Sequence, residues 1–174
     1  MYRTLVFMVL LSLTFSCKNE TKKPSEEKTT TYYLIRHAEK DRSAPSNPNP
    51  VLTEKGTQRA KHWATYFDTI PLNKIFSTNY LRTQQTAALV AKNKNLPIIP
   101  YDPKNVIDAE FLKATEKNQV LIVGHSNTTP MLVNQILKQQ KYEDIPDNDN
   151  SRLYVVQLKN GQATSEIRTV NLPN

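Results

Sequence analysis

The chain has little of several residues that mark common classes of protein. It contains a single cysteine, Cys17, so it cannot form an internal disulfide. It has only 3 glycines against 11 prolines, which excludes a glycine-rich loop of the kind that cradles nucleotide phosphates. It also has only 3 histidines, and two of them, His37 and His125, follow apolar runs. Histidines in that position are candidates for chemistry at strand ends.

Charge and acidic residues exclude further classes. The net charge is +7, with Lys and Arg scattered and no helix-turn-helix or aromatic RNA-binding motif, so we expect no nucleic-acid partner. A modest positive charge suits the attraction of anionic substrates. The acids Glu143, Asp144, Asp147 and Asp149 lack the spacing and the glycine of an EF-hand loop. We therefore expect an exposed acidic loop there and no metal site.

The first residues predict export and a lipid anchor. A basic start followed by a short apolar run is typical of a signal peptide, here residues 1–16. LSLTFSC resembles a bacterial lipoprotein cleavage box, with Thr14 in place of the more usual Leu, and this resemblance implies that Cys17 is lipidated. A plain signal peptide with an incidental cysteine is the alternative. Residues 17–30 are polar and predict a flexible linker, which leaves one domain over residues 31–174.

Hydrophobic patterning beyond the linker alternates between strands and helices. Strands are predicted where β-branched and apolar residues run together: 31–35, 74–76, 98–101, 119–123, 153–158 and 166–170, the last two joined by a hairpin turn at 159–161. Helices are predicted from the N-cap Thr53 to about 67, over 80–92 and 106–114, and from the N-cap Thr129 to about 139. In the second helix, Leu81, Ala88 and Leu89 are expected to face inward. This order predicts an α/β three-layer sandwich with a mostly parallel central sheet and helices on both faces.

Polar residues follow each of the four early strands. They are Arg36-His37, Ser77, Asp102 and Gly124-His125. Ligands of such sheets bind beyond the carboxyl ends of the strands, so we expect these residues around one site. Arg82 follows the second strand closely, and each guanidinium offers a planar fork of N–H donors to a phosphate. Two guanidiniums and two imidazoles make a phosphate-handling site the leading interpretation.

Four motifs in this order resemble the histidine phosphatase superfamily, also called the phosphoglycerate mutase-like fold. They are RHAE from Arg36, with Ala38 in place of the usual Gly; the LTEKG helix start at Leu52–Gly56; the pattern SxxxxRTxxTA at Ser77–Ala87; and Gly124-His125 followed by Asn127. The resemblance covers about Tyr32 to Val170, and short members of the phosphohistidine phosphatase group are the most similar. It implies the fold already predicted from the patterning.

The resemblance also implies a role for each motif residue. His37 would be the nucleophile that forms a phosphohistidine, and the resemblance, not the spacing, selects it over His125. Arg36, Arg82 and Asn127 would bind the phosphoryl oxygens, and His125, if protonated, would add another positive donor. Because the arginines supply the counter-charge, we expect neither a metal nor another cofactor.

The proton donor for the leaving oxygen is less well determined. The resemblance places an Asp or Glu in the loop after the third strand, and Asp102 fits that location best. Glu110 matches a later acidic position, although helical phasing could turn it away, and Asp108 is a third alternative. Thr78 is expected to cap the following helix, and His62, on an amphipathic helix without partners, to have no role.

The short domain favours a metal-independent phosphatase over a mutase. No insertion is large enough to cover the site and trap a released intermediate against water. If the lipid anchor holds, the protein is exported and membrane-anchored, in the periplasm or at the cell surface of a bacterium. Its substrate would be a phosphorylated small molecule or an envelope component. The alternative is an envelope lipoprotein that binds phosphate-bearing ligands without turnover.

Overall fold

The computed structural model describes residues 29–105 and 107–173. The predicted signal peptide, Cys17 and most of the linker lie outside the described residues, so their roles stay predictions. The first strand begins at Thr29, two residues before the predicted domain boundary. The reason is local, because Thr30 is buried and its Oγ1 accepts a hydrogen bond from the backbone N–H of Lys117 at 2.9 Å.

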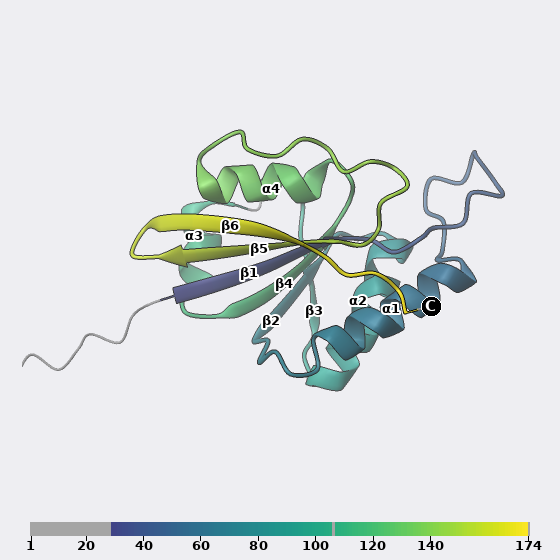
Figure 1. Cartoon of the computed structure of the whole chain (residues 1–174), viewed down its shortest axis with the longest axis horizontal. Helices are drawn as coiled ribbons and strands as arrows, with labels where there is room; N and C mark the ends of the chain where they lie inside the picture. Colours follow the sequence, from purple (N-terminus) through teal and green to yellow (C-terminus); the bar gives the residue numbers. More distant parts are fainter. Residues whose placement is uncertain (1–28, 106, 174) are drawn as a thin grey trace, which may run out of the picture.

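A six-stranded mixed sheet forms the centre of the fold (Figure 1). Its strands are β1 Thr29–Arg36, β2 Lys74–Ser77, β3 Ile98–Pro100, β4 Gln119–Gly124, β5 Arg152–Lys159 and β6 Gln162–Thr169. They are ordered β3-β2-β4-β1-β5-β6, and the first four are parallel to one another while β5 and β6 are antiparallel additions. The almost wholly apolar sequence of β4 and the buried residues 32–35 of β1 fit their central places, where both faces are covered.

Two layers of helices cover the sheet and complete the predicted three-layer sandwich. The helices are α1 Glu54–Tyr66, α2 Leu81–Lys94, α3 Ala109–Ala114 and α4 Thr128–Leu137. On one face, Trp63 and Phe67 from the α1 region pack with Val90 of α2. On the other face, Phe111 of α3 packs with Leu132 of α4 (Figure 1). Every helix within the described ranges is too short or too polar to cross a membrane.

Helix α2 turns a different face to the core from the one predicted. Leu81 and Ala88 are exposed, and Leu89 is only half-buried. The buried positions include Thr83 and Thr86. Each of these hydroxyls donates to backbone carbonyls, which removes most of the cost of burying a polar group. Apolar spacing alone therefore set the phase of this helix incorrectly.

The predicted helix caps were partly wrong. Thr53 caps α1 as predicted, with its Oγ1 accepting from the N–H of Gly56 at 3.0 Å. Helix α4 starts two residues earlier than predicted, with Asn127 in place of Thr129 as the N-cap residue, because the Thr129 hydroxyl donates to a β1 carbonyl and is not available to cap. Thr78 does not cap α2, whose N-cap is Tyr80.

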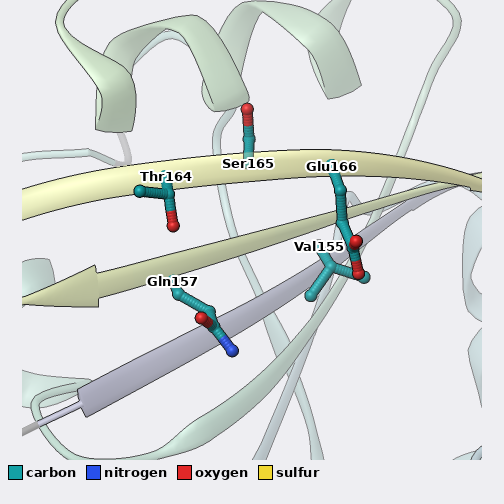
Figure 2. Close-up of a pocket in the computed structure, with 5 residues that line it drawn as sticks. All are labelled: Val155, Gln157, Thr164, Ser165 and Glu166. Carbon is teal, nitrogen blue, oxygen red and sulfur yellow. The ribbon is translucent and has the colours of Figure 1, made fainter.

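The β5–β6 hairpin forms one side of the sheet, with β6 as the outermost strand. Asn160 and Gly161 form its turn with φ values of 52° and 80°, as the sequence predicts for a two-residue hairpin. A hollow of about 290 Å³ lies on this hairpin, and Figure 2 shows its lining residues: Val155, Gln157, Thr164, Ser165 and Glu166. This lining holds no imidazole or guanidinium.

The four parallel strands end at one edge of the sheet. Arg36 at the end of β1 pairs with Gly124 at the end of β4, and Ser77 at the end of β2 pairs with Val123. This register brings the polar residues after each strand to a common edge, far along the strands from the β5–β6 turn (Figure 1).

Candidate active site

Two imidazoles meet where β1 and β4 end. The His37 backbone N–H donates to the Gly124 carbonyl at 2.9 Å, which continues the β1–β4 pairing by one residue. The ring centroids of His37 and His125 are 5.6 Å apart, with the planes at 66°. That separation lets both rings contact the same tetrahedral anion. Sequence positions 37 and 125 are thus brought together by parallel strand pairing alone.

His37 is buried, neutral and fixed in one tautomer. Its Nδ1 lies 2.7 Å from the backbone carbonyl of Ala38. Because a carbonyl can only accept, Nδ1 carries the proton, and Nε2 keeps its lone pair. Burial, reinforced by the charges of Arg36 and Arg82, lowers the pKa of His37 to about 3. At neutral pH the ring is therefore uncharged and its Nε2 is able to attack phosphorus.

His125 is held in the opposite tautomer by a chain of hydroxyls. The Thr83 hydroxyl donates to the carbonyls of residues 78 and 80, each at 2.8 Å, and accepts from the Thr78 hydroxyl at 3.0 Å. The single Thr78 proton is thereby used, so Thr78 Oγ1 accepts from His125 Nε2 at 2.9 Å. On the other side of the ring, Arg82 Nη2 is 3.5 Å from His125 Nδ1. Since a guanidinium can only donate, Nδ1 carries the lone pair.

In the free protein, His125 is not in the protonated state on which its role as a positive donor depends. Burial first, and then the nearby charges of Arg82, Lys40 and Arg36, lower its pKa to about 4. The ring is therefore neutral at pH 7, rather than a standing positive donor. A dianionic phosphoryl group beside Nδ1 would raise the pKa and let this nitrogen take up a proton and donate it.

Two N–H donors of Arg82 have no acceptor among the described residues. Its Nε and Nη1 are buried and have no hydrogen-bond partner among the described residues. The Tyr80 ring centroid lies 4.4 Å from the Cζ atom of Arg82. The same ring contacts the His125 ring edge-on, with the ring centroids 5.1 Å apart. Tyr80 therefore helps to hold both the guanidinium and the imidazole in place. Buried unpaired N–H groups are costly in a folded protein. An anion that accepted from them would remove that cost.

Arg36 is in a different state. Its side chain is 3% exposed, and its Nη1 donates to three backbone carbonyls, those of residues 146, 147 and 149, at 2.9–3.2 Å. Its Nη2 donates to the Asp147 carboxylate at 2.6 Å. Only Nε is buried without a partner. The predicted acidic loop is exposed at Asp147, but its contact with Arg36 could not be predicted from the sequence.

The structure separates the three candidates for the proton donor. Asp102 lines a hollow of about 500 Å³ together with Arg82, His125 and Asn127. Asp102 also lines a neighbouring hollow of about 330 Å³, and Glu110 and Asp108 line only that one of the two. Asp108 also caps α3, where its Oδ1 accepts from the Phe111 N–H at 2.7 Å. Asp102 is thus the candidate that shares a cavity with the imidazole and the guanidinium.

Several supporting residues act on the backbone around His37. Asn150 Nδ2 donates to the His37 carbonyl at 2.8 Å, and Thr86 Oγ1 accepts from the Ala38 N–H at 2.9 Å. Asn150 is 113 residues from His37, so no spacing could have identified it.

The glycine of LTEKG has a steric reason. A Cβ at Gly56 would lie 2.1 Å from the Glu39 carbonyl oxygen, closer than any side chain allows. The Glu39 carboxylate in turn accepts from Arg59 Nε and Nη2 at 2.8–3.0 Å. The RHAE and LTEKG motifs therefore lock together and fix the chain that leaves the site.

The comparisons with known proteins bear on the family and the fold. Residues 32–103 match the family model of the histidine phosphatase superfamily (branch 1). No curated protein sequence matches the chain significantly. Among solved structures, the protein histidine phosphatase SixA complexed with tungstate is 20% identical, with a TM-score of 0.64 over 80% of this chain and 96% of SixA.

Two further structures share the fold. The alpha-ribazole phosphatase from Shigella flexneri is 14% identical, with a TM-score of 0.60 over 83% of this chain and 100% of that protein. Phosphoglycerate mutase from Bacillus anthracis is 15% identical, with a TM-score of 0.57 over 80% and 92%. At these identities the structures establish the fold. The family match over residues 32–103 supports an enzyme that acts on phosphate groups.

Proposed function

Starting from the support for the histidine phosphatase superfamily, we propose that the chain is a phosphatase that hydrolyses phosphomonoesters, or phosphoanhydride or phosphoprotein groups, through a phosphohistidine on His37. One observation carries the proposal. A buried, neutral imidazole with a free Nε2 lies against a second imidazole and beside a guanidinium that has two unpaired N–H groups. This combination would supply a nucleophile and an anion site at the same place.

In the first step, His37 Nε2 attacks phosphorus in line, and the bond from phosphorus to the leaving oxygen breaks. The electron pair goes to the leaving oxygen, which takes a proton from the Asp102 carboxyl group. Arg82 donates to the equatorial oxygens, and His125 donates from Nδ1 once the phosphoryl charge has raised its pKa.

In the second step, water attacks the phosphohistidine. The Asp102 carboxylate takes a proton from that water, the phosphorus–nitrogen bond breaks, and its electron pair returns to His37 Nε2. Inorganic phosphate leaves, and both residues are restored to their starting states. The counter-charge comes from arginines, so we propose that no metal is needed.

We favour hydrolysis over mutase chemistry because water can reach the site. A mutase has to retain the released intermediate and exclude water. The segment that could cover His37, residues 41–49, is exposed along most of its length. The longer segment 138–151, between α4 and β5, is held beside Arg36 because its carbonyls at residues 146, 147 and 149 accept from that guanidinium.

We further propose that the protein is exported and held at a bacterial membrane through lipidated Cys17. The support is the signal-like sequence of residues 1–16 and the lipoprotein-like box. Substrates would then be phosphorylated small molecules or envelope components outside the cytoplasm. Membrane fractionation tests this, because Cys17→Ser should release the protein into the soluble fraction, and an unchanged distribution would defeat the anchor.

Turnover of p-nitrophenyl phosphate by the full chain tests the activity. We expect hydrolysis that survives a chelator, is blocked by vanadate and is lost in His37→Ala. The matched control is His62→Ala, at a half-buried position of α1, which should keep full activity. Undiminished turnover in His37→Ala would eliminate the proposed nucleophile. Phosphate binding without turnover of any of a broad substrate panel would favour the non-catalytic lipoprotein instead.

A further inference from the structure

A second hollow is lined by His37 and not by Arg82. It has a volume of about 190 Å³ and is formed by the end of β1, the loop after it, the start of α1 and the loop before β5. Its lining includes four cationic side chains, those of Arg36, Lys40, Arg42 and Lys55. Two carboxylates, Glu39 and Asp147, oppose them. None of its lining residues is shared with the hollow that holds Arg82 and His125.

The positive charge of this hollow is only partly compensated. Glu39 is engaged by Arg59, which lies outside the lining, through two guanidinium nitrogens at 2.8–3.0 Å. Lys55 is 3.9 Å from the same carboxylate and receives little from it. Asp147 is thus the one lining carboxylate whose charge is directed at the cations of the hollow. The positive charges of the four lining cations are therefore balanced by little more than one carboxylate charge.

Asp147 holds two guanidiniums at once. Its Oδ1 is 2.6 Å from Arg36 Nη2, and its Oδ2 is 2.7 Å from Arg42 Nη2. The Asp147 side chain is 69% exposed, so charge and not burial keeps it there. Hydrogen bonds from Arg42 and then Arg36 lower the pKa of this carboxyl group, which therefore stays ionised. A carboxylate between two guanidiniums occupies the position that an anionic ligand group would take.

Lys40 adds a cation without a partner. Within residues 29–105 and 107–173, its ammonium makes no hydrogen bond or ion pair, although its backbone is fixed by a bridge to Leu52. Burial first, and then the charges of Arg82 and Arg42, lower its pKa. Lys40 thus lies in the overlapping fields of the guanidiniums on both sides of His37. An anion in the hollow would relieve that repulsion.

We propose that this hollow is a second anion subsite, which binds a phosphate or carboxylate group of the same substrate whose phosphoryl group is transferred to His37. In the free protein, Asp147 pairs with the guanidiniums that would bind this group, and the substrate displaces it on binding. The substrate class is then a small molecule with two anionic groups a few bonds apart, because His37 lines this hollow and its ring centroid lies 5.6 Å from that of His125 in the other. The proposal rests on the proposed function for its reacting phosphoryl group.

Binding of three small phosphonates to the full chain tests the subsite. Methylphosphonate carries one anionic group, methylenediphosphonate carries two phosphonates, and phosphonoacetate carries a phosphonate and a carboxylate. By titration calorimetry, we expect one or both of the doubly anionic probes to bind about tenfold or more tightly than methylphosphonate. Which of the two binds better identifies the second group as phosphate or carboxylate.

Variants of the hollow should change this preference specifically. In Arg42→Ala and Lys40→Ala the ratio of the dissociation constants should fall toward one, and Arg42→Lys should restore part of it. In Asp147→Asn the preference should increase, because the internal competitor has lost its charge. The matched control is Lys61→Ala, an exposed lysine on α1, in which the ratio should be unchanged.

Two results would overturn the subsite. One is equal binding of all three probes by the unaltered chain. The other is an Asp147→Asn variant that binds methylphosphonate more tightly by the same factor as the doubly anionic probes, since Asp147 would then compete with the reacting phosphate itself. Neither result depends on turnover. If the unaltered chain binds the doubly anionic probes more tightly but does not hydrolyse p-nitrophenyl phosphate, the phosphatase proposal is contradicted and the subsite proposal is supported.

Discussion

The two halves of the site use the same side-chain chemistry in opposite states. In the β4 half, Arg82 beside His125 keeps two buried N–H groups without partners. In the β1 half, Arg36 beside His37 donates to three carbonyls and a carboxylate of the loop before β5. The Arg82 guanidinium has donors available for a ligand, whereas the Arg36 guanidinium also stabilises the loop before β5. The same residue type can therefore serve binding alone or binding and stability together, depending on what the fold brings to it.

Replacing each arginine should separate these states and have the largest effect. Arg82→Ala should lower kcat/KM by about 10²–10³-fold, since it removes a preorganised donor, without lowering the free energy of unfolding. Arg36→Ala should lower kcat/KM and also cost about 2–4 kcal/mol of stability, because buried carbonyls lose their donor. Enzyme kinetics and urea unfolding measure both. Arg168→Ala on exposed β6 is the control for loss of an arginine.

Equal stability losses in Arg82→Ala and Arg36→Ala would contradict the comparison. They would mean that the open donors of Arg82 have partners in solution, or that the loop before β5 does not depend on Arg36.

Asp102 should matter only where the leaving group needs a proton. Asp102→Asn should lower kcat by about 10²-fold for an alkyl phosphate, and far less for p-nitrophenyl phosphate, whose leaving group departs as an anion. Glu110→Gln lies in the neighbouring hollow and should change neither rate. Steady-state kinetics with the two substrates gives the ratio. A larger loss in Glu110→Gln than in Asp102→Asn would transfer the proton donor to Glu110.

The hydroxyl chain of the β4 half predicts a smaller, more specific effect. Thr78→Val keeps the shape but removes the acceptor for His125 Nε2, so kcat should fall by about tenfold, and Thr78→Ser should restore it. The tautomer is read by ¹⁵N NMR of the ring. The unaltered chain should show a protonated Nε2, and Thr83→Val, which frees the Thr78 proton, should shift the equilibrium toward the other tautomer. A protonated Nδ1 in the unaltered chain would refute the assignment.

The free energy of unfolding should depend on pH through the imidazoles of both halves, His37 and His125. The pKa of His37 is lowered to about 3 and that of His125 to about 4, against about 6.5 in the unfolded chain. The unfolded state therefore binds more protons below pH about 6.5, and stability falls as the pH falls, by up to about 2.7 kcal/mol per pH unit. Urea unfolding between pH 7 and 5 measures the slope. His37→Ala should remove about half of it, and an undiminished slope would contradict the neutral His37.

The sheet and half of the site could be predicted from the sequence because their signals are local. Apolar runs identify β1 and β4, and the residues that follow them, Arg36-His37 and His125, meet because parallel strands end at one edge. The fold class follows from the alternation of strands and helices. The hairpin at Asn160-Gly161 was predicted from turn chemistry, which is also local.

The other features depend on contacts across the chain. Asp147 reaches Arg36 over 111 residues, and no pattern of residue types announces such a contact. Thr83 was missed because a buried hydroxyl and an exposed one look alike until the hydrogen-bond partners are known. The proton donor stayed open among Asp102, Glu110 and Asp108 because the short α3 gives too few residues for its phase to be read.

The central claim is that His37 Nε2 takes up the phosphoryl group. Rapid quenching of the full chain with a ³²P-labelled phosphomonoester tests it most directly. We predict label bound to the protein that survives base and is lost in acid, as phosphohistidine is, that maps to His37 and that is absent from His37→Ala. Turnover without such label, or label on His125, would contradict the account.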